Sequence, residues 1–203
     1  MNKIKILSLL LLTIPGLSYG FGTGVSTYPI MLDKKFISGE FTGITSTGGG
    51  VGVQGRYTQR LNSKTIIDAG IGMSGGERTS RLFAGADFEI YPDYQNQPRV
   101  SVKTTFENAE EFDVRRNTIG VAPTISKGFS FWGHEAYPFA SLPYRVSLDS
   151  DNNTYQTQAN LNLGITGALP FEGYKHLTGT LEASVKLKDS YSGIFMGISY
   201  PIN

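Results

Sequence analysis

The fold is decided by the stretch YQTQANLNLGIT, residues 155–166, in which apolar and polar side chains alternate. Residues two apart on a β-strand point to the same face of the sheet. One face of this segment is therefore mainly apolar, whereas the other carries Gln156, Gln158, Asn160 and Asn162. The pattern predicts a strand with an apolar environment on one side and a polar one on the other.

The same alternation recurs along most of the chain. Eight further segments show it, namely residues 51–61, 67–74, 81–90, 99–107, 118–126, 139–148, 176–187 and 194–202. A tenth segment, residues 36–45, has a blurred alternation. Most are close to the roughly 9–11 residues that a tilted strand needs to cross a bilayer. Because glycine is abundant and no useful helical period is present, we predict an all-β protein.

The first twenty residues have the features of a signal peptide. Lys3 and Lys5 precede an apolar run at residues 6–14, and the small residues Ser18 and Gly20 occupy the positions that a signal peptidase requires. We expect cleavage before Phe21. Residues 1–20 are thus assigned to the signal peptide, and residues 21–203 to one β-barrel domain.

Charge and cysteine content exclude several classes of protein. Removing the two lysines of the signal peptide leaves 16 basic against 17 acidic residues, a net charge of −1. A nucleic-acid-binding protein would carry a basic excess, so we predict no nucleic-acid partner. The chain has no cysteine, which excludes a lipoprotein anchor and a disulfide framework.

Two architectures share the alternating pattern, and the connections between segments favour the membrane one. In a soluble barrel the apolar face is the core, whereas in a membrane barrel it meets lipid. Every second connection is rich in aromatic residues, and those between are polar, as in a barrel with an aromatic girdle at one interface. The candidate girdle residues are Tyr91, Tyr94, Phe129, Phe131, Trp132, Phe171, Tyr174 and Tyr200.

We therefore predict a single antiparallel, up-and-down transmembrane β-barrel of ten strands, with eight as the alternative. An even number of strands brings both termini to the aromatic side, which is periplasmic in bacterial barrels. The count depends on residues 36–45, because without that segment nine strands remain.

The end of the chain resembles the C-terminal insertion signal of bacterial outer-membrane barrel proteins. The match consists of Gly197, Tyr200 and Ile202, whereas Phe195 and Asn203 depart from it. The resemblance implies a location in the outer membrane, insertion by the barrel-assembly machinery, and contact with outer-membrane lipids and lipopolysaccharide. It leaves the subfamily and the oligomeric state open.

The polar faces carry charges of both signs, which we predict to line the lumen. The candidates are Arg56, Arg60, Asp68, Arg81, Asp87, Glu89, Arg99, Lys103, Arg145, Glu182 and Lys186. They could line a conduction path, or they could form ion pairs that fill a narrow barrel. Ten strands lie close to the size that side chains can fill, which favours the second interpretation.

Three motifs have ordinary explanations. The G-x-G-x-x-G at residues 50–55 runs into a strand and not into a helix, so we do not expect a dinucleotide site. Asp149, Asp151 and Asn153 alternate in a loop, but the chain lacks the glycine and glutamate of a calcium loop. We place His134 and His176 near the periplasmic turns, whereas omptin-like proteases and lipid A deacylases use histidine near the outer side. We therefore predict no catalytic residue, cofactor or metal.

The sequence predicts a non-enzymatic outer-membrane barrel, either structural or a narrow channel with a charge-lined lumen. One alternative is a soluble periplasmic or secreted barrel that binds an apolar ligand. A second alternative is an outer-membrane enzyme that modifies lipids or peptides.

Overall fold

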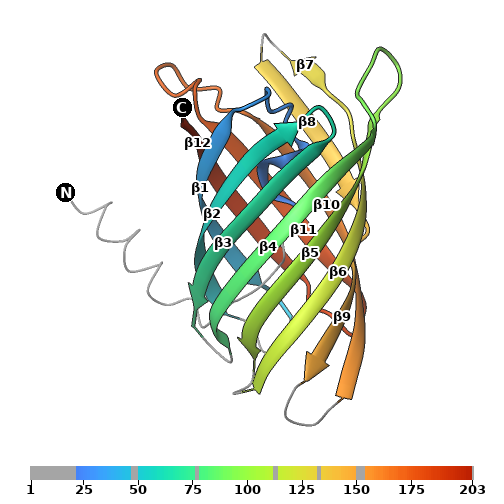
Figure 1. Cartoon of the computed structure of the whole chain (residues 1–203). Helices are drawn as coiled ribbons and strands as arrows, with labels where there is room; N and C mark the ends of the chain where they lie inside the picture. Colours follow the sequence, from blue (N-terminus) through green and yellow to red (C-terminus); the bar gives the residue numbers. More distant parts are fainter. Residues whose placement is uncertain are drawn as a thin grey trace, which may run out of the picture.

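The computed structural model describes residues 22–46, 50–75, 78–111, 114–131, 134–149 and 154–202, so the expected signal peptide lies outside the described residues. Its β-segments form one closed antiparallel barrel of ten strands (Figure 1). The segments are β1 (Lys35–Ile44), β2 (Val51–Asn62), β3 (Thr65–Ser74), β4 (Arg78–Tyr91), β5 (Arg99–Glu111), β6 (Val114–Ser126), β7 (Phe129–Phe131), β8 (His134–Ser141), β9 (Tyr144–Asp149), β10 (Thr154–Ala168), β11 (Thr178–Lys188) and β12 (Gly193–Ile202).

Two of the ten barrel strands consist of two segments each. β7 extends β6, because both pair with β8. β8 and β9 form the next strand, since both pair with β6 on one side and with β10 on the other. The interruption between them falls at Leu142 and Pro143, and proline cannot donate a backbone hydrogen bond to the ladder.

The barrel closes between its first and last strands. β1 pairs with β12 over its whole length, from Lys35 opposite Ile202 to Ile44 opposite Gly193. The blurred segment at residues 36–45 is therefore a strand, and the prediction of a ten-stranded antiparallel barrel is confirmed. We call the end where β1 begins and β12 ends the terminal end, and the opposite end the loop end.

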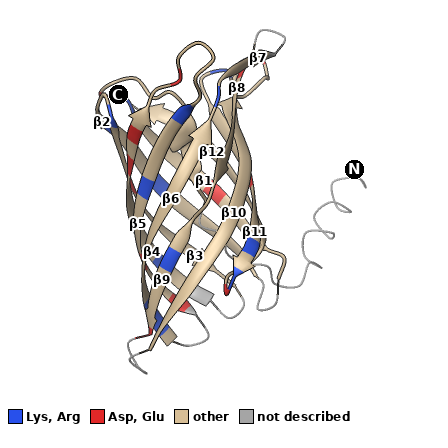
Figure 2. Cartoon of the chain, turned by 90° about the vertical axis from the view of Figure 1, so that its right-hand side faces the viewer, with Lys and Arg blue, Asp and Glu red and all other residues tan. Residues whose placement is uncertain are grey.

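The burial of side chains is reversed relative to a water-soluble barrel. In β12, inward-facing Phe195 and Ser199 are each 2% exposed, whereas outward-facing Ile198 is 53% exposed. In β3, buried Asp68 alternates with exposed Ile71 and Met73. Charged residues occur within the wall as well as at its ends (Figure 2). The polar faces thus point into the barrel and the apolar faces point out.

The described part of the chain contains one short helical element, the 3-10 turn η1 (Gly24–Thr27). None of the described residues forms a helix long and apolar enough to cross a membrane. The turn belongs to the segment that precedes β1 (Figure 1). This segment is central to the candidate site.

Candidate functional site

The lumen is filled by charged side chains that come mostly from one half of the wall. Among the residues whose burial is described, strands β1–β5 contribute eight buried charged residues, four acidic and four basic, whose charges cancel. They are Glu40, Arg56, Asp68, Arg81, Asp87, Arg99, Lys103 and Glu107. Charges removed from water need partners, so their balance is a requirement for a stable barrel.

Arg56 is the centre of this cluster. Its Nε lies 2.8 Å from Glu40 Oε1, and its Nη1 lies 2.7 Å from Asp68 Oδ2. Lys103 forms a second ion pair with Asp68. The Arg56 guanidinium also lies over the ring of Phe83, 4.7 Å from its centroid, in a cation–π contact. The planar guanidinium can satisfy all these partners at once, which an ammonium could not.

Two further groups continue the cluster along the lumen. Toward the loop end, Arg81 Nε lies 2.9 Å from Glu107 Oε1, and Arg81 donates to Gln54 at 2.9 Å. Toward the terminal end, Arg99 pairs with Asp87 at 2.8 Å and with Glu89 at 3.0 Å. The ion pairs join the neighbouring strands β4 and β5, whereas the hydrogen bond from Arg81 to Gln54 reaches from β4 to β2, past β3.

The opposite half of the wall, β6–β12, presents amides and hydroxyls. Asn160 donates to Ser184 at 3.0 Å, and Asn162 accepts from the same hydroxyl at 2.8 Å. Glu182 is the one fully buried charge found on the described part of these strands, and Asn162 donates to it at 2.6 Å. Its carboxylate has no ion pair within 4 Å among the described residues.

The segment before β1 lies inside the lumen, between these two halves. We call residues 22–27 the plug. All six are buried, although they precede the first strand. The Thr23 N–H donates to Glu182 Oε2 at 2.7 Å, and its carbonyl accepts from Lys103 Nζ at 3.0 Å. The Gly22 carbonyl accepts from Arg56 Nη2 at 3.1 Å. The plug thus connects the charged half of the wall with Glu182 on the other half.

The plug is held at its other end by packing and by hydroxyls. Thr27 donates to Thr166 at 2.9 Å. Val25 and Ile30 pack with Phe36 and Ile66, in an apolar cluster of their own. The chain leaves the lumen at the terminal end, where Arg60 donates to the Ile30 carbonyl at 2.9 Å. This cluster and these bonds fix the path of the segment into β1.

Tyr28 lies where the plug leaves the lumen. Its ring contacts that of Tyr137 edge to face, with 5.4 Å between the centroids. Burial raises the pKa of Tyr28 above its ordinary value, and the nearby Glu135 carboxylate adds to the rise. Both causes keep the phenol neutral.

The lumen candidates from the sequence fall into three groups in the structure. The buried network contains Arg56, Asp68, Arg81, Asp87, Arg99, Lys103 and Glu182. Arg60, Glu89 and Arg145 are partly buried, and Arg145 donates to Asn160 at 2.8 Å. Lys186 is exposed near the end of β11, so it does not join the network.

Sequence reasoning missed several participants. Glu40 lies on the strand whose alternation is blurred, and Glu107 ends the predicted segment 99–107 but was not among the lumen candidates, although both are buried in the wall. Inward-facing Phe83, Phe139 and Phe195 were placed on polar faces without a role. The plug was missed altogether, and its only signal was a run of small residues, GTGVST, at residues 22–27.

The candidate girdle residues that the structure describes lie at the terminal end. Tyr91, Tyr94, Phe129, Phe171, Tyr174 and Tyr200 are each roughly half exposed or more. Phe131 lies in β7, and Trp132 is outside the described residues. Of the insertion-signal residues, Gly197 is buried, Tyr200 is exposed and Ile202 is partly buried. The ring of Tyr200 contacts His176 edge to face at 5.8 Å.

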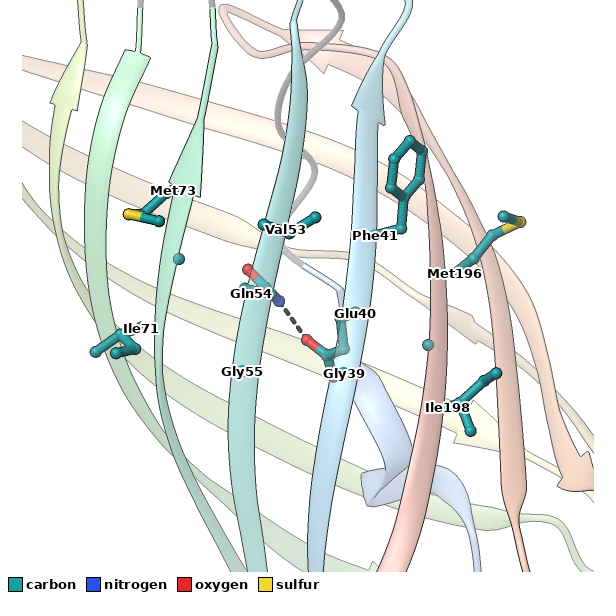
Figure 3. A pocket seen from close by; sticks show the side chains of 12 residues that line it. Gly39, Glu40, Phe41, Val53, Gln54, Gly55, Ile71, Met73, Met196 and Ile198 are labelled. Carbon is teal, nitrogen blue, oxygen red and sulfur yellow. Dashed lines mark hydrogen bonds between the residues drawn. The ribbon is translucent and has the colours of Figure 1, made fainter. Parts of the chain in front are cut away.

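A second concave feature lies on the outer wall (Figure 3). It is a groove of about 850 Å³ over β12, β1, β2 and β3. Its floor is the cross-strand pair Gly39 and Gly55, and a side chain at either position would meet open space. The rim consists of Phe41, Val53, Ile71, Met73, Met196 and Ile198. The groove is apolar and suits hydrocarbon.

The described residues contain no group of three or more His, Asp or Glu side chains placed to hold a metal ion. His134 begins β8 at the terminal end, and His176 precedes β11 at the same end. The geometry therefore presents a closed, charge-balanced lumen with a peptide segment bound inside it.

Comparisons with known proteins give structural likenesses only. No family model matches the sequence, and no curated protein matches it. A de novo designed transmembrane β-barrel is similar over 85% of this chain and 98% of its own, with 13% identity and a TM-score of 0.41. The KdgM porin is similar over 84% and 99%, with 12% identity and a TM-score of 0.37. LpxR from Salmonella typhimurium is similar over 82% and 99%, with 10% identity and a TM-score of 0.41. Likenesses at this level do not bear on function.

Proposed function

We propose that this chain is an outer-membrane β-barrel without enzymatic activity, a narrow channel whose lumen is closed at rest by its own N-terminal plug. The observation that carries the proposal is the plug: residues 22–27 are buried inside the barrel and hydrogen-bonded to charged side chains of both halves of its wall. A lumen occupied by backbone and ion pairs leaves little room for water or solutes.

The outer wall supports the membrane location. Its strands expose large apolar side chains along their length, such as Ile71 at 67%, Leu82 at 53% and Leu163 at 50%. Water-soluble proteins rarely leave contiguous apolar patches above a few hundred Å² in contact with water. A lipid bilayer removes this cost, and the closed ladder leaves no strand edge exposed to hydrocarbon. A soluble carrier of an apolar ligand would need the opposite arrangement, with an apolar lumen.

The engagement of the charged groups supports a non-enzymatic role. The lumen carboxylates accept hydrogen bonds from arginine, lysine, asparagine or the plug, and Glu182 is occupied by Thr23 and Asn162. The two histidines, which could serve as general bases, lie at the terminal end and away from this network. Carboxylates that are engaged in this way stabilise the barrel and are poorly placed to act on a substrate.

Two measurements test the proposal. The mature protein should fractionate with outer membranes, require detergent for extraction and migrate differently on gels before and after boiling. In planar bilayers it should be silent, whereas a variant lacking residues 22–28 should show steady openings. Substitution of exposed Met31 by alanine serves as the control and should stay silent. A deletion variant that folds and remains silent would favour a purely structural barrel.

A further inference from the structure

The plug is attached to the lumen in the way a ligand is attached to a binding site. In the described chain, the backbone–backbone hydrogen bonds of residues 22–30 stay within the segment, from Tyr28 N–H to Val25 and from Ile30 N–H to Tyr28. The segment therefore adds no strand to the barrel. It is held by side chains of the wall, and each of these could release it without breaking a backbone ladder.

The wall recognises the main chain of the plug through three charged side chains. Arg56 of β2 binds the Gly22 carbonyl, Lys103 of β5 binds the Thr23 carbonyl, and Glu182 of β11 binds the Thr23 N–H. Such charge-assisted bonds are about twice as strong as neutral ones. Three strands far apart in the sequence thus provide complementary partners for consecutive polar groups of one peptide.

The three recognising side chains are held in place by the wall itself. Arg56 is fixed by Glu40 and Asp68, and Lys103 is fixed by Asp68. Asn162 donates to Glu182 independently of the plug. A site whose side chains are ordered before the ligand arrives loses less entropy on binding.

Selectivity for the peptide comes from two glycines. A side chain at Gly22 would come within 2.5 Å of the Phe195 ring, which is 2% exposed and closely surrounded. Gly24 has φ of +71°, a conformation that disfavours other residues, and its position faces the Arg56 guanidinium at 3.0 Å. Thr23 adds a hydroxyl that donates to Glu182. The site therefore selects the pattern Gly-Thr-Gly.

We propose that the lumen contains a peptide-binding site for a segment with the pattern Gly-Thr-Gly followed by a 3-10 turn, and that the plug is its tethered but exchangeable ligand. The same site accepts the segment when it is supplied as a free peptide. A cavity of about 200 Å³ lies beside Thr27 and Pro29 at the terminal end, where the plug leaves the lumen. The inference rests on the proposed function in one respect: both require that the barrel stays folded when the plug leaves the lumen.

The test measures peptide binding to the refolded variant that lacks residues 22–28, in detergent, by fluorescence anisotropy. The probe is a labelled synthetic peptide of residues 22–34. Peptides with Gly22→Ala or Gly24→Ala are compared with a Met31→Ala peptide, because Met31 is 75% exposed. The heat-modifiability gel shows that the deletion variant is folded before binding is measured.

We expect saturable binding of the natural peptide and equal binding of the Met31→Ala peptide. The Gly24→Ala peptide should bind about tenfold more weakly, as expected for a side chain in the left-handed region. Glu182→Gln in the deletion variant should weaken the natural peptide too. Absence of binding to a folded barrel, or equal binding of all four peptides, would overturn the inference. If the deletion variant binds the peptide without conducting ions, the channel proposal fails and the peptide site stands.

Discussion

The two halves of the inner wall differ in how their buried polar side chains are paired. In the described part of strands β1–β5, eight buried charges pair with one another, around Arg56, Arg81 and Arg99. Strands β6–β12 carry hydroxyls and amides around a single fully buried carboxylate, Glu182, among the described residues. In the first half the charges have ion-pair partners within the wall, and Arg56 and Lys103 also bind the plug. In the second half Glu182 accepts hydrogen bonds only from Asn162 and from Thr23 of the plug among the described contacts.

Because of this difference, we expect the stability of the barrel and the binding of the plug to respond to different substitutions. Substitutions in the charged half should affect the stability of the barrel, because they leave partners buried without compensation. Substitutions in the amide half should affect the seating of the plug and leave the barrel folded.

Arg56→Ala should have the largest effect. It leaves Glu40 and Asp68 buried with fewer partners, and losing one member of a buried ion pair costs about 3–5 kcal/mol of unfolding free energy. Urea unfolding in lipid vesicles measures this loss. Arg115→Ala is the control, since Arg115 is exposed, and it should change the unfolding free energy by less than about 1 kcal/mol. Similar losses of unfolding free energy in the two variants would show that the buried ion pairs of Arg56 contribute no more to stability than the exposed contacts of Arg115.

Glu182→Gln should release the plug without unfolding the barrel. The substitution removes the charge that accepts the Thr23 N–H, and a hydrogen bond to a charged group contributes about 1.5–3 kcal/mol. Amide hydrogen exchange of residues 22–28, measured by mass spectrometry, should accelerate by one order of magnitude or more, while urea unfolding changes little. Glu172→Gln, at an exposed site between β10 and β11, is the matched control. A barrel that unfolds as readily as the Arg56 variant would contradict the expected difference between the two halves.

Thr166→Val should loosen only the end of the plug nearest β1. It removes the acceptor for the Thr27 hydroxyl, a neutral hydrogen bond that contributes about 1 kcal/mol. Exchange should increase near Thr27 and stay unchanged at Thr23. The control is Thr118→Val, which breaks a hydroxyl pair with Ser147 away from the plug and should leave exchange of the plug unaltered. Acceleration over the whole plug would mean that its two ends are released together.

Asp149→Asn should have the smallest effect. Asp149 pairs with Arg116 at 3.9 Å near the loop end, where both side chains are partly exposed. Exposed pairs contribute about 0–1 kcal/mol, so neither unfolding in urea nor exchange of the plug should change measurably. A loss comparable to that of Glu182→Gln would place Asp149 in the network that holds the lumen.

Period-two alternation was sufficient to predict the barrel. It identified the inward faces of β2, β4 and β10, because each residue of a strand has only two directions to point. It was weakest in β1, where the inward face carries apolar Phe36 and Ile44 as well as Glu40, and the outward face contains Gly39 and Gly43. Pairing with β12 and β2 fixes that strand, and such pairing is not visible in its local sequence.

The plug could not be predicted in the same way. Residues 22–27 have no period, and their burial follows from partners on β2, β5 and β11 that lie up to 159 residues away. Charges on inward faces were visible in the sequence, but the pairing of Arg56 with both Glu40 and Asp68 depends on the register of three strands. Long-range contacts of this kind are set by the closed ring and not by local preference.

The closure between β1 and β12 has a consequence for assembly. This seam joins the two strands that are farthest apart in the chain, as in the bond between Ser38 and Ser199, so it carries the largest loop-closure entropy of the ring. The plug reaches across the seam, from Arg56 of β2 to Glu182 of β11. It therefore bridges the two sides of this seam from inside the barrel. Without the plug, we expect the pairing between β1 and β12 to be the first to break when the barrel unfolds.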